Sequence, residues 1–153
     1  MSNAFLYRMP AGIAGAVTRL EVAKIEPNVM DPDTPVTVYG VPVVKVAGKI
    51  QPYAGSGTIL GFLVRPYPTQ MENITNQSLG GGTPSVNQTC DILRSGYMTV
   101  LNTLGTPAID GAVYVNNTTG LIQADATGAT AVTGAKFEGA ADDNGNVEIS
   151  FNI

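Results

Sequence analysis

Carboxylates are the residues of this chain that could do chemistry, because histidine is absent. The 153 residues include no His, which excludes Ser-His-Asp and Cys-His catalysis and any His-ligated zinc site. Asp31 with Asp33 and Asp142 with Asp143 form two close pairs, and paired carboxylates can support glycoside hydrolysis. Both pairs lie among turn-forming Pro or Gly residues, and Trp is absent. We interpret both pairs as turn residues, and we predict no catalytic residue.

Three further motifs fall short of a site. The run 142–146, DDNGN, begins like a calcium loop, but the twelfth position from Asp142 is Ile153 instead of the closing Glu. Gly80-Gly81-Gly82-Thr83 lacks the GK[ST] ending of a phosphate loop. Cys90 is the only cysteine, so no intrachain disulfide can form, and the nearest basic residue in sequence is Arg94. We predict a hairpin turn, a flexible loop and a structural thiol, with no metal and no cofactor.

Composition indicates one folded domain with an unusually uncharged surface. The chain is 44% apolar with 18 Gly and 10 Pro, and only 13% of its residues are charged, against about a quarter in an average globular protein. Residues 1–94 carry seven basic and six acidic residues, net +1, whereas residues 95–153 carry one basic and six acidic, net −5. The acidic second part argues against nucleic acid as a partner. Low charge instead favours a surface that faces protein partners.

The chain shows no sign of export or membrane insertion. Its first residues lack the basic and continuous apolar regions of a signal peptide. The longest strongly apolar run, 59–64, is far shorter than the roughly 20 residues of a membrane-spanning helix. We therefore expect synthesis in the cytoplasm and no membrane partner.

Short apolar runs punctuated by turns predict an all-β protein. Helical periodicity is nearly absent, and 91–94 could form one short turn at most. We expect a single-domain antiparallel β-sandwich or barrel with jelly-roll-like connections at 18–153, preceded by an extended N-terminal arm at 1–17. Residues 27–35 form a loop, and 66–89 form a long irregular loop of the kind that is usually functional. The expected strands are 18–25, 36–46, 50–52, 58–65, 96–101, 112–115, 121–124, 135–138 and 147–151.

The order and spacing of Gly and apolar residues predict one β unit used twice. In residues 39–70, Gly40 precedes a Val-rich strand, and Gly48-Lys49-Ile50-Gln51 and Gly61 follow. In residues 110–138 the same order recurs with Gly111, Gly120-Leu121-Ile122-Gln123 and Gly134. Either duplication or a shared turn-and-strand pattern explains the echo. Both explanations favour a structural or binding protein.

Five short motifs stand out along the chain: Tyr39-Gly40-Val41-Pro42-Val43, 61–68 (GFLVRPYP), Gly111-Ala112-Val113-Tyr114-Val115, Gly134-Ala135 and Val147-Glu148-Ile149. On these motifs the chain resembles the structural cement, or capsid decoration, proteins of tailed bacteriophages. The resemblance implies a non-enzymatic protein that is made in the host cytoplasm and lies on the outer surface of the capsid of the virion, where it joins neighbouring copies of the major capsid protein. It brings no catalytic residues.

Two segments are the expected contacts with the capsid. An apolar arm can offset its ordering entropy by burying surface on a partner, and Tyr67 between two prolines is a rigid aromatic suited to an interface. We also expect a homo-oligomer, dimer or trimer, because unpaired strand edges need covering. The predicted capsid-contact residues are Phe5, Leu6, Tyr7, Arg8, Met9, Arg65, Pro66, Tyr67 and Pro68.

Two other functions stay open from the sequence. A host-surface or glycan-binding β-sandwich module of a virion would show an exposed aromatic or Asn/Asp-lined groove. A carboxylate-based hydrolase would lose its turnover when one of the paired Asp residues became Asn.

Overall fold

The protein is almost entirely β-structure, as the sequence predicts. The computed structural model describes residues 12–66, 83–86 and 89–153. Within these residues the only helix is the short 3-10 turn η1 (Leu20–Val22). The strands are β1 (Lys24–Val29), β2 (Pro42–Val46), β3 (Lys49–Pro52), β4 (Ile59–Leu63), β5 (Thr89–Leu101), β6 (Ala112–Asn116), β7 (Ile122–Gln123), β8 (Ala129–Phe137) and β9 (Asn146–Phe151).

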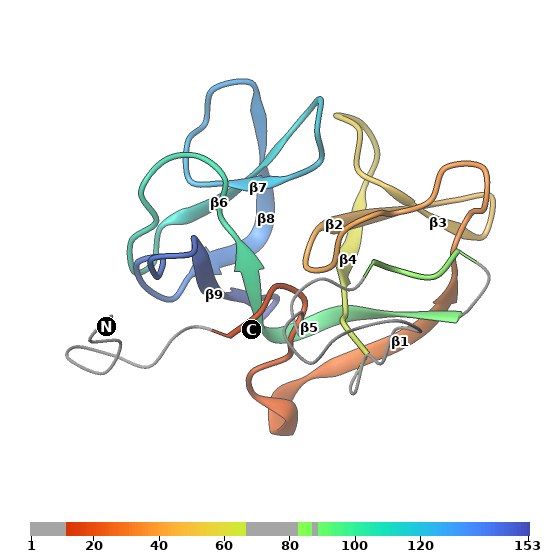
Figure 1. Ribbon diagram of the computed structural model, residues 1–153, viewed down its shortest axis with the longest axis horizontal. Coiled ribbons are helices and arrows are strands. Elements are labelled where there is room, and N and C mark those ends of the chain that lie inside the picture. The colour runs from red at the N-terminus through yellow and green to blue at the C-terminus, as the bar shows by residue number, and fades with distance from the viewer. Residues whose placement is uncertain (1–11, 67–82, 87–88) are drawn as a thin grey trace, which may run out of the picture.

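The strands form two halves that share β5. The antiparallel pairing order is β3-β2-β4-β5-β9-β8-β6-β7, with β1 paired to the first part of β5. Strands β1 to β4 lie on one side of the molecule and β6 to β9 on the other, while the 13-residue β5 runs through both (Figure 1). The all-β class is confirmed, whereas the jelly-roll-like connections stay unconfirmed.

The order of pairing is the same in both halves. Strand β2 pairs with β3 and β4, and β4 pairs with β5; correspondingly, β6 pairs with β7 and β8, and β8 pairs with β9. The first part of β5 closes the first half against β1, and β9 closes the second half against the last part of β5. One isolated parallel bridge then links the edge strands of each half, Met30 with Ile50 and Asn102 with Ile122. The repeat seen in the sequence is therefore a repeat of topology, five strands long.

Hydrogen bonds fix which residues correspond. Gly40 N–H donates to Leu63 O at 2.9 Å in the first half. Asp110 N–H donates to Phe137 O at 2.8 Å in the second. Gly40 therefore corresponds to Asp110 and not to Gly111, one residue from the match in the sequence. Both residues have positive φ, 76° and 60°, and Asp is among the few non-glycine residues that tolerate this conformation.

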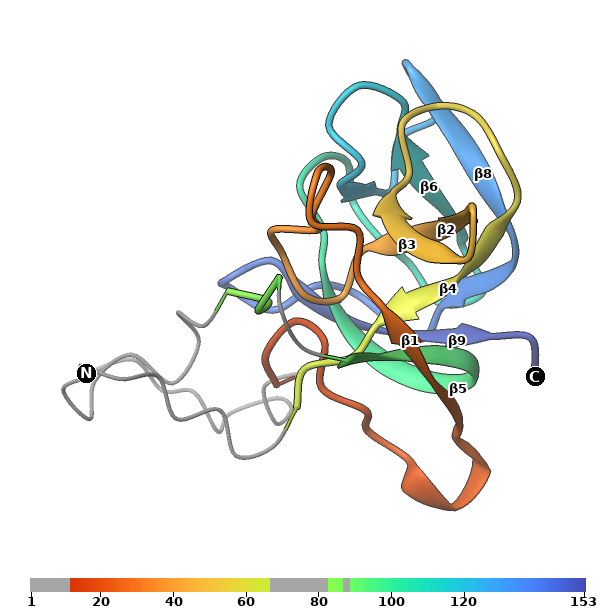
Figure 2. The same cartoon turned by 90° about the vertical axis from the view of Figure 1, so that its right-hand side faces the viewer.

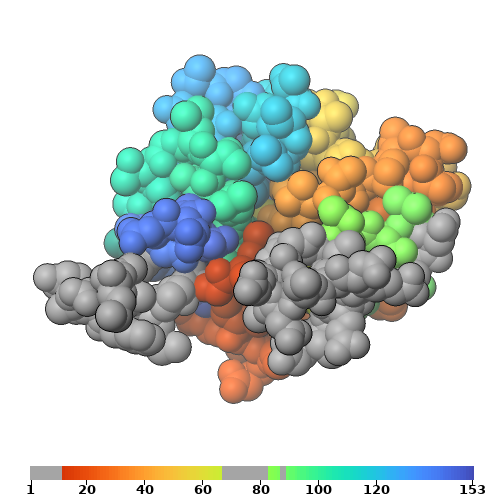
Figure 3. Space-filling model, viewed as in Figure 1, coloured from red at the N-terminus to blue at the C-terminus, as the bar shows by residue number. Residues whose placement is uncertain are grey.

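The core continues from one half into the other. One cluster of buried residues, including Leu63 and Ile92, fills the first half, and a larger one fills the second half and the boundary between them. Phe62 is fully buried and meets Phe151 edge to face, with ring centroids 5.1 Å apart. Adjacent side chains of a strand point to opposite faces, so Leu63 serves the first core and Phe62 the boundary. The space-filling view shows the halves in contact (Figure 3).

The faces that would repeat this boundary are polar. By strand register, Phe62 and Leu93 of the first half correspond to Lys136 and Ser150 of the second. In the second half, Met98 and Phe151 lie in the cluster at the boundary. Their counterparts in the first half are Glu26 and Arg94, whose Oε2 and Nε atoms are 3.5 Å apart. The boundary between the halves is apolar, whereas the residues at its two counterpart positions are polar or charged.

Five expected elements differ from those observed. Residues 18–25 contain η1 and only the start of β1, because the alternating Leu20 and Val22 are exposed instead of lying in a half-buried strand. Strand β1 continues into the first three residues of the expected loop 27–35, since an edge strand accepts Pro27. Strand β2 begins at Pro42, six residues after the start of the expected 36–46 strand.

The other two strands are longer than expected. Strand β5 begins at Thr89, seven residues before the expected 96–101 strand, and β8 begins at Ala129, six residues before the expected 135–138 strand.

Candidate functional site

Both carboxylate pairs belong to turns, as interpreted from the sequence. The Asp31 carboxylate accepts hydrogen bonds from Gln51 Nε2 at 2.6 Å, from Asp33 N–H at 3.2 Å and from Thr34 Oγ1 at 3.2 Å. These bonds, led by that from Gln51, lower the pKa of Asp31. Its two oxygens thus stabilise the chain around residues 31–34.

The second pair forms the predicted hairpin turn between β8 and β9. Asp142 Oδ1 accepts the N–H of Asn144 at 2.9 Å and of Asn146 at 2.8 Å, and Gly145 N–H donates to Asp142 O. Within the part of the chain that the structure describes, no three Cys, Asp or Glu side chains gather as metal ligands do. In the same part, no helix has the length and apolarity to span a bilayer.

Cys90 is placed as a structural thiol. Its Sγ lies 3.4 Å from Asn28 O on the neighbouring strand β1, and burial raises the pKa of the thiol. A raised pKa leaves less thiolate, the nucleophilic form, at neutral pH.

The described end of the predicted arm is fixed to β5. Gly15 N–H donates to Thr99 O at 2.8 Å, Thr99 N–H donates to Ala16 O at 2.9 Å, and Thr18 N–H donates to Tyr97 O at 3.1 Å. Residues 12–18 therefore cover the edge of β5 opposite β9, and Figure 3 shows this segment in red where the two halves meet. Residues 1–11 lie outside the described part of the chain, so the arm at 1–17 stays a prediction.

Arg65 joins this segment to the end of β4. Its N–H donates to Gly15 O at 2.8 Å, and its Nε donates to Ala14 O at 2.9 Å. The guanidinium stacks over the Tyr39 ring, 4.6 Å from the centroid, and Tyr39 Oη donates to Thr83 O at 3.4 Å. Burial lowers the pKa of Arg65 and raises that of Tyr39. We call the group 12–16, 39–40, 64–66 and 83–84 the junction.

Close packing at the junction demands glycine. Gly15 has φ +87°, and a Cβ on it would lie 2.6 Å from Tyr39 Cβ and 3.0 Å from Arg65 Cβ. Both distances are shorter than ordinary contacts, and L side chains disfavour this φ. The backbone of the segment can therefore approach Arg65 and Tyr39 only because residue 15 has no side chain.

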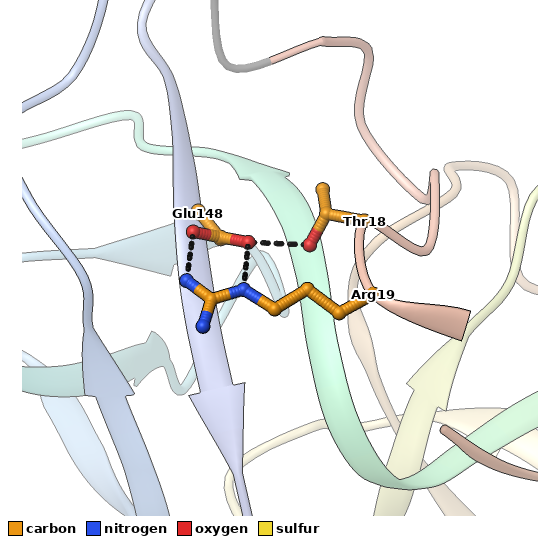
Figure 4. A network of polar contacts seen from close by, with 3 residues as sticks. All are labelled: Thr18, Arg19 and Glu148. Atoms are coloured by element: carbon orange, nitrogen blue, oxygen red, sulfur yellow. Dashed lines mark hydrogen bonds and ion pairs between the residues drawn. The ribbon is translucent and has the colours of Figure 1, made fainter. Parts of the chain in front are cut away.

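A second polar group fixes the segment from its other end. Arg19 donates to Glu148 Oε2 at 3.0 Å and Oε1 at 3.3 Å, and Thr18 Oγ1 donates to Glu148 Oε1 at 2.5 Å (Figure 4). The hydrogen bond and the charge of Glu148 raise the pKa of Arg19. The same guanidinium lies 3.8 Å from the centroid of Tyr97. Segment 12–19 is thus attached to β5 and β9 along its length.

The structure places two of the nine predicted contact residues. Arg65 is half-buried in the junction and Pro66 is exposed beside it. The other seven, Phe5, Leu6, Tyr7, Arg8, Met9, Tyr67 and Pro68, lie outside the described residues. What the structure adds is that Gly15 and Arg65, which lead to the two predicted contact segments, touch each other.

Comparison with known proteins assigns the chain to a family. The family model described as XM1 gp53 minor capsid protein matches residues 1–151. The chain belongs to this minor capsid protein family. The resemblance to phage capsid-associated proteins is confirmed, and the family is one of structural capsid proteins. No curated protein matches the sequence.

A solved structure shares the fold. A chain in the capsid of Myoviridae phage XM1 superposes with a TM-score of 0.69 and 21% sequence identity, covering 99% of this chain and 97% of that one. At this identity the likeness concerns the fold. Sequence inspection missed Gly15, Tyr39 and the group of Arg19, Tyr97 and Glu148, because their partners lie up to 130 residues away and no spacing rule connects them.

Proposed function

We propose that the protein binds the outside of a phage head and joins neighbouring copies of the major capsid protein, without catalysis. Membership of the minor capsid family supports a capsid role. The junction is the observation that carries the finer proposal. Hydrogen bonds fix the backbone that leads to the arm, at Gly15, against the backbone that leads to the 66–89 loop, at Arg65. Two segments that start together can contact two adjoining subunits.

The rigidity of the junction supports this role. Fixing one residue costs about 1–2 kcal/mol of backbone entropy, so a contact segment binds more strongly when its root is already ordered. Arg65 and Gly15 provide such roots without large apolar burial. Asp142, Asp143 and Asp110 of the acidic second half belong to turns elsewhere, and we place that half towards solvent.

Sedimentation with heads that lack the protein tests the proposal. Wild-type protein should sediment with these heads and raise the temperature at which they release DNA. Deletion of residues 1–11, which leaves the described segment intact, should weaken binding at least tenfold. Lys136→Ala is the matched control, since the side chain of this exposed residue of the second half forms an ion pair with the exposed Asp110, 3.8 Å away. This variant should bind like wild type.

Two results would contradict the proposal. Wild-type protein that stays in the supernatant would exclude binding to the head. Equal binding by the deletion variant and Lys136→Ala would exclude the arm as a contact. We also propose that the protein forms a symmetric dimer or trimer. Light scattering would then give a mass two or three times that of a single chain.

A further inference from the structure

The edge of β5 that residues 15–18 cover has a counterpart in the first half. Strand β1 of the first half corresponds to the last part of β5 in the second half. In the first half Glu26 is the register partner of Ile92, and in the second half Met98 is the register partner of Ile149. Ile25 and Pro27 therefore correspond to Tyr97 and Thr99. Those two residues of β5 make the backbone bonds to segment 15–18.

No described residue pairs with the counterpart edge on β1. Ahead of the Met30 bridge, the described residues include no segment that pairs with β1 on the side away from β5. Figure 2 shows β1 on the outside of the first half, with η1 projecting at its foot. Thr99 is fully buried beneath the N-terminal segment, whereas Pro27 is exposed.

Apolar side chains line this edge. Leu20 is 74% exposed, Val22 50%, Ile25 39% and Val29 58%, and Pro27 lies between the last two. All five lie within ten residues of the chain, and groups of exposed apolar residues mark interaction sites. Ile25 is also the register partner of Leu93, which belongs to the core cluster at the boundary between the halves.

Backbone chemistry selects the kind of partner. Alternate residues of an edge strand direct N–H and C=O outward, so Ile25 O and Pro27 O correspond to the acceptors Tyr97 O and Thr99 O. Pro27 lacks the N–H with which Thr99 donates to Ala16 O. Two β1 strands from different copies, paired edge to edge, would each lack this donor, whereas a different added strand would lose one backbone bond only. Glu26 and Arg94 pair with each other, so the edge offers little net charge to a charged segment.

We propose that β1 accepts an extended, uncharged, apolar segment of another capsid protein, added as an antiparallel strand in the register that residues 15–18 use on β5. The inference rests on the proposed capsid role and adds a second contact, separate from the junction. Strand addition draws affinity from main-chain bonds and specificity from alternate side chains. Here the added strand would donate to Ile25 O and Pro27 O and pack on Ile25 and Val29.

Head binding by three variants tests this contact. Val29→Lys should weaken sedimentation with heads about tenfold, and Val46→Lys should not, because Val46 is a similarly exposed strand valine, 47% exposed, on β2. Pro27→Thr restores the missing donor and should tighten binding about fivefold, the factor given by one hydrogen bond of about 1 kcal/mol. A photo-crosslinking residue at position 29 should join β1 to a different capsid protein in assembled heads.

Each contrary result has its own meaning. Equal binding by the two lysine variants, or weaker binding by Pro27→Thr, would overturn strand addition at β1. Crosslinks from position 29 to a second copy of this chain would overturn the choice of partner. If wild-type protein did not bind heads, the proposed function would fail first and this inference with it.

Discussion

The substitution Gly15→Ala places a methyl group where the N-terminal segment touches Tyr39 and Arg65. The new Cβ would lie 2.6 Å from Tyr39 Cβ and 3.1 Å from Arg65 N. Neither neighbour is the free end of a flexible side chain, so the backbone of the segment has to move. This movement breaks two hydrogen bonds, the one that Gly15 N–H donates to Thr99 O and the one that Arg65 N–H donates to Gly15 O.

The expected loss of stability adds two parts. A non-glycine residue in the left-handed region costs about 1 kcal/mol or more, and each of two lost hydrogen bonds costs about 1 kcal/mol. We therefore expect the free energy of unfolding to fall by about 3 kcal/mol. With a urea m-value of about 2 kcal/mol/M, the unfolding midpoint should fall by about 1.5 M.

Gly48→Ala is the matched control, because Gly48 has φ +84° and no atom lies within 4 Å of its added Cβ. It should lower the midpoint by about 0.5 M, the conformational part alone. Urea unfolding followed by tyrosine fluorescence measures both variants, since the chain has no Trp. Equal midpoints for the two variants would refute the close packing inferred at the junction.

Three further substitutions test other contacts. Phe62→Ala should lower the free energy of unfolding by about 3–5 kcal/mol in thermal or urea melts, because it empties the boundary between the halves; a loss below about 1 kcal/mol would contradict the packing against Phe151. Asp31→Asn tests a carboxylate whose folded pKa lies below its unfolded value. Wild type should exceed the variant in stability above the unfolded pKa, and the difference should vanish as pH falls through the folded pKa; a constant difference down to acid pH would exclude the linkage. Glu148→Gln should cost at most about 1 kcal/mol, since Arg19 is exposed, and the cost should shrink in 1 M salt if the ion pair carries it.

The sequence predicted the elements whose burial follows from local pattern. The nearly continuous apolar run of the expected strand 58–65 predicts burial on both faces. In the observed strand, Ile59–Leu63, Phe62 and Leu63 are both fully buried, one in each core. The turns at 116–120 and 142–145 follow from Asn, Asp and Gly residues, and Gly120 N–H indeed donates to Asn116 O. These features need only neighbours in sequence.

Features that depend on distant partners were not predictable in this way. Residues 89–95 pair with β1 and β4, and buried and exposed side chains do not alternate regularly along them. Their sequence therefore lacks the alternation that predicts a strand. Leu20 and Val22 alternate like strand residues but face solvent. The junction joins Gly15 to Arg65, fifty residues apart, and only the fold reveals that the two predicted contact segments begin together.

The polar counterparts of the boundary between the halves set a limit on growth. Lys136 and Ser150 stand where the first half has Phe62 and Leu93, and Glu26 and Arg94 stand where the second half has Met98 and Phe151. If all four were apolar, one copy could dock head to tail on the next in the way that its own halves pack together. Such heterologous contacts do not close, and they build open filaments. Polar and charged residues at both ends of the repeated topology therefore keep each copy a finite unit instead of a link in a filament.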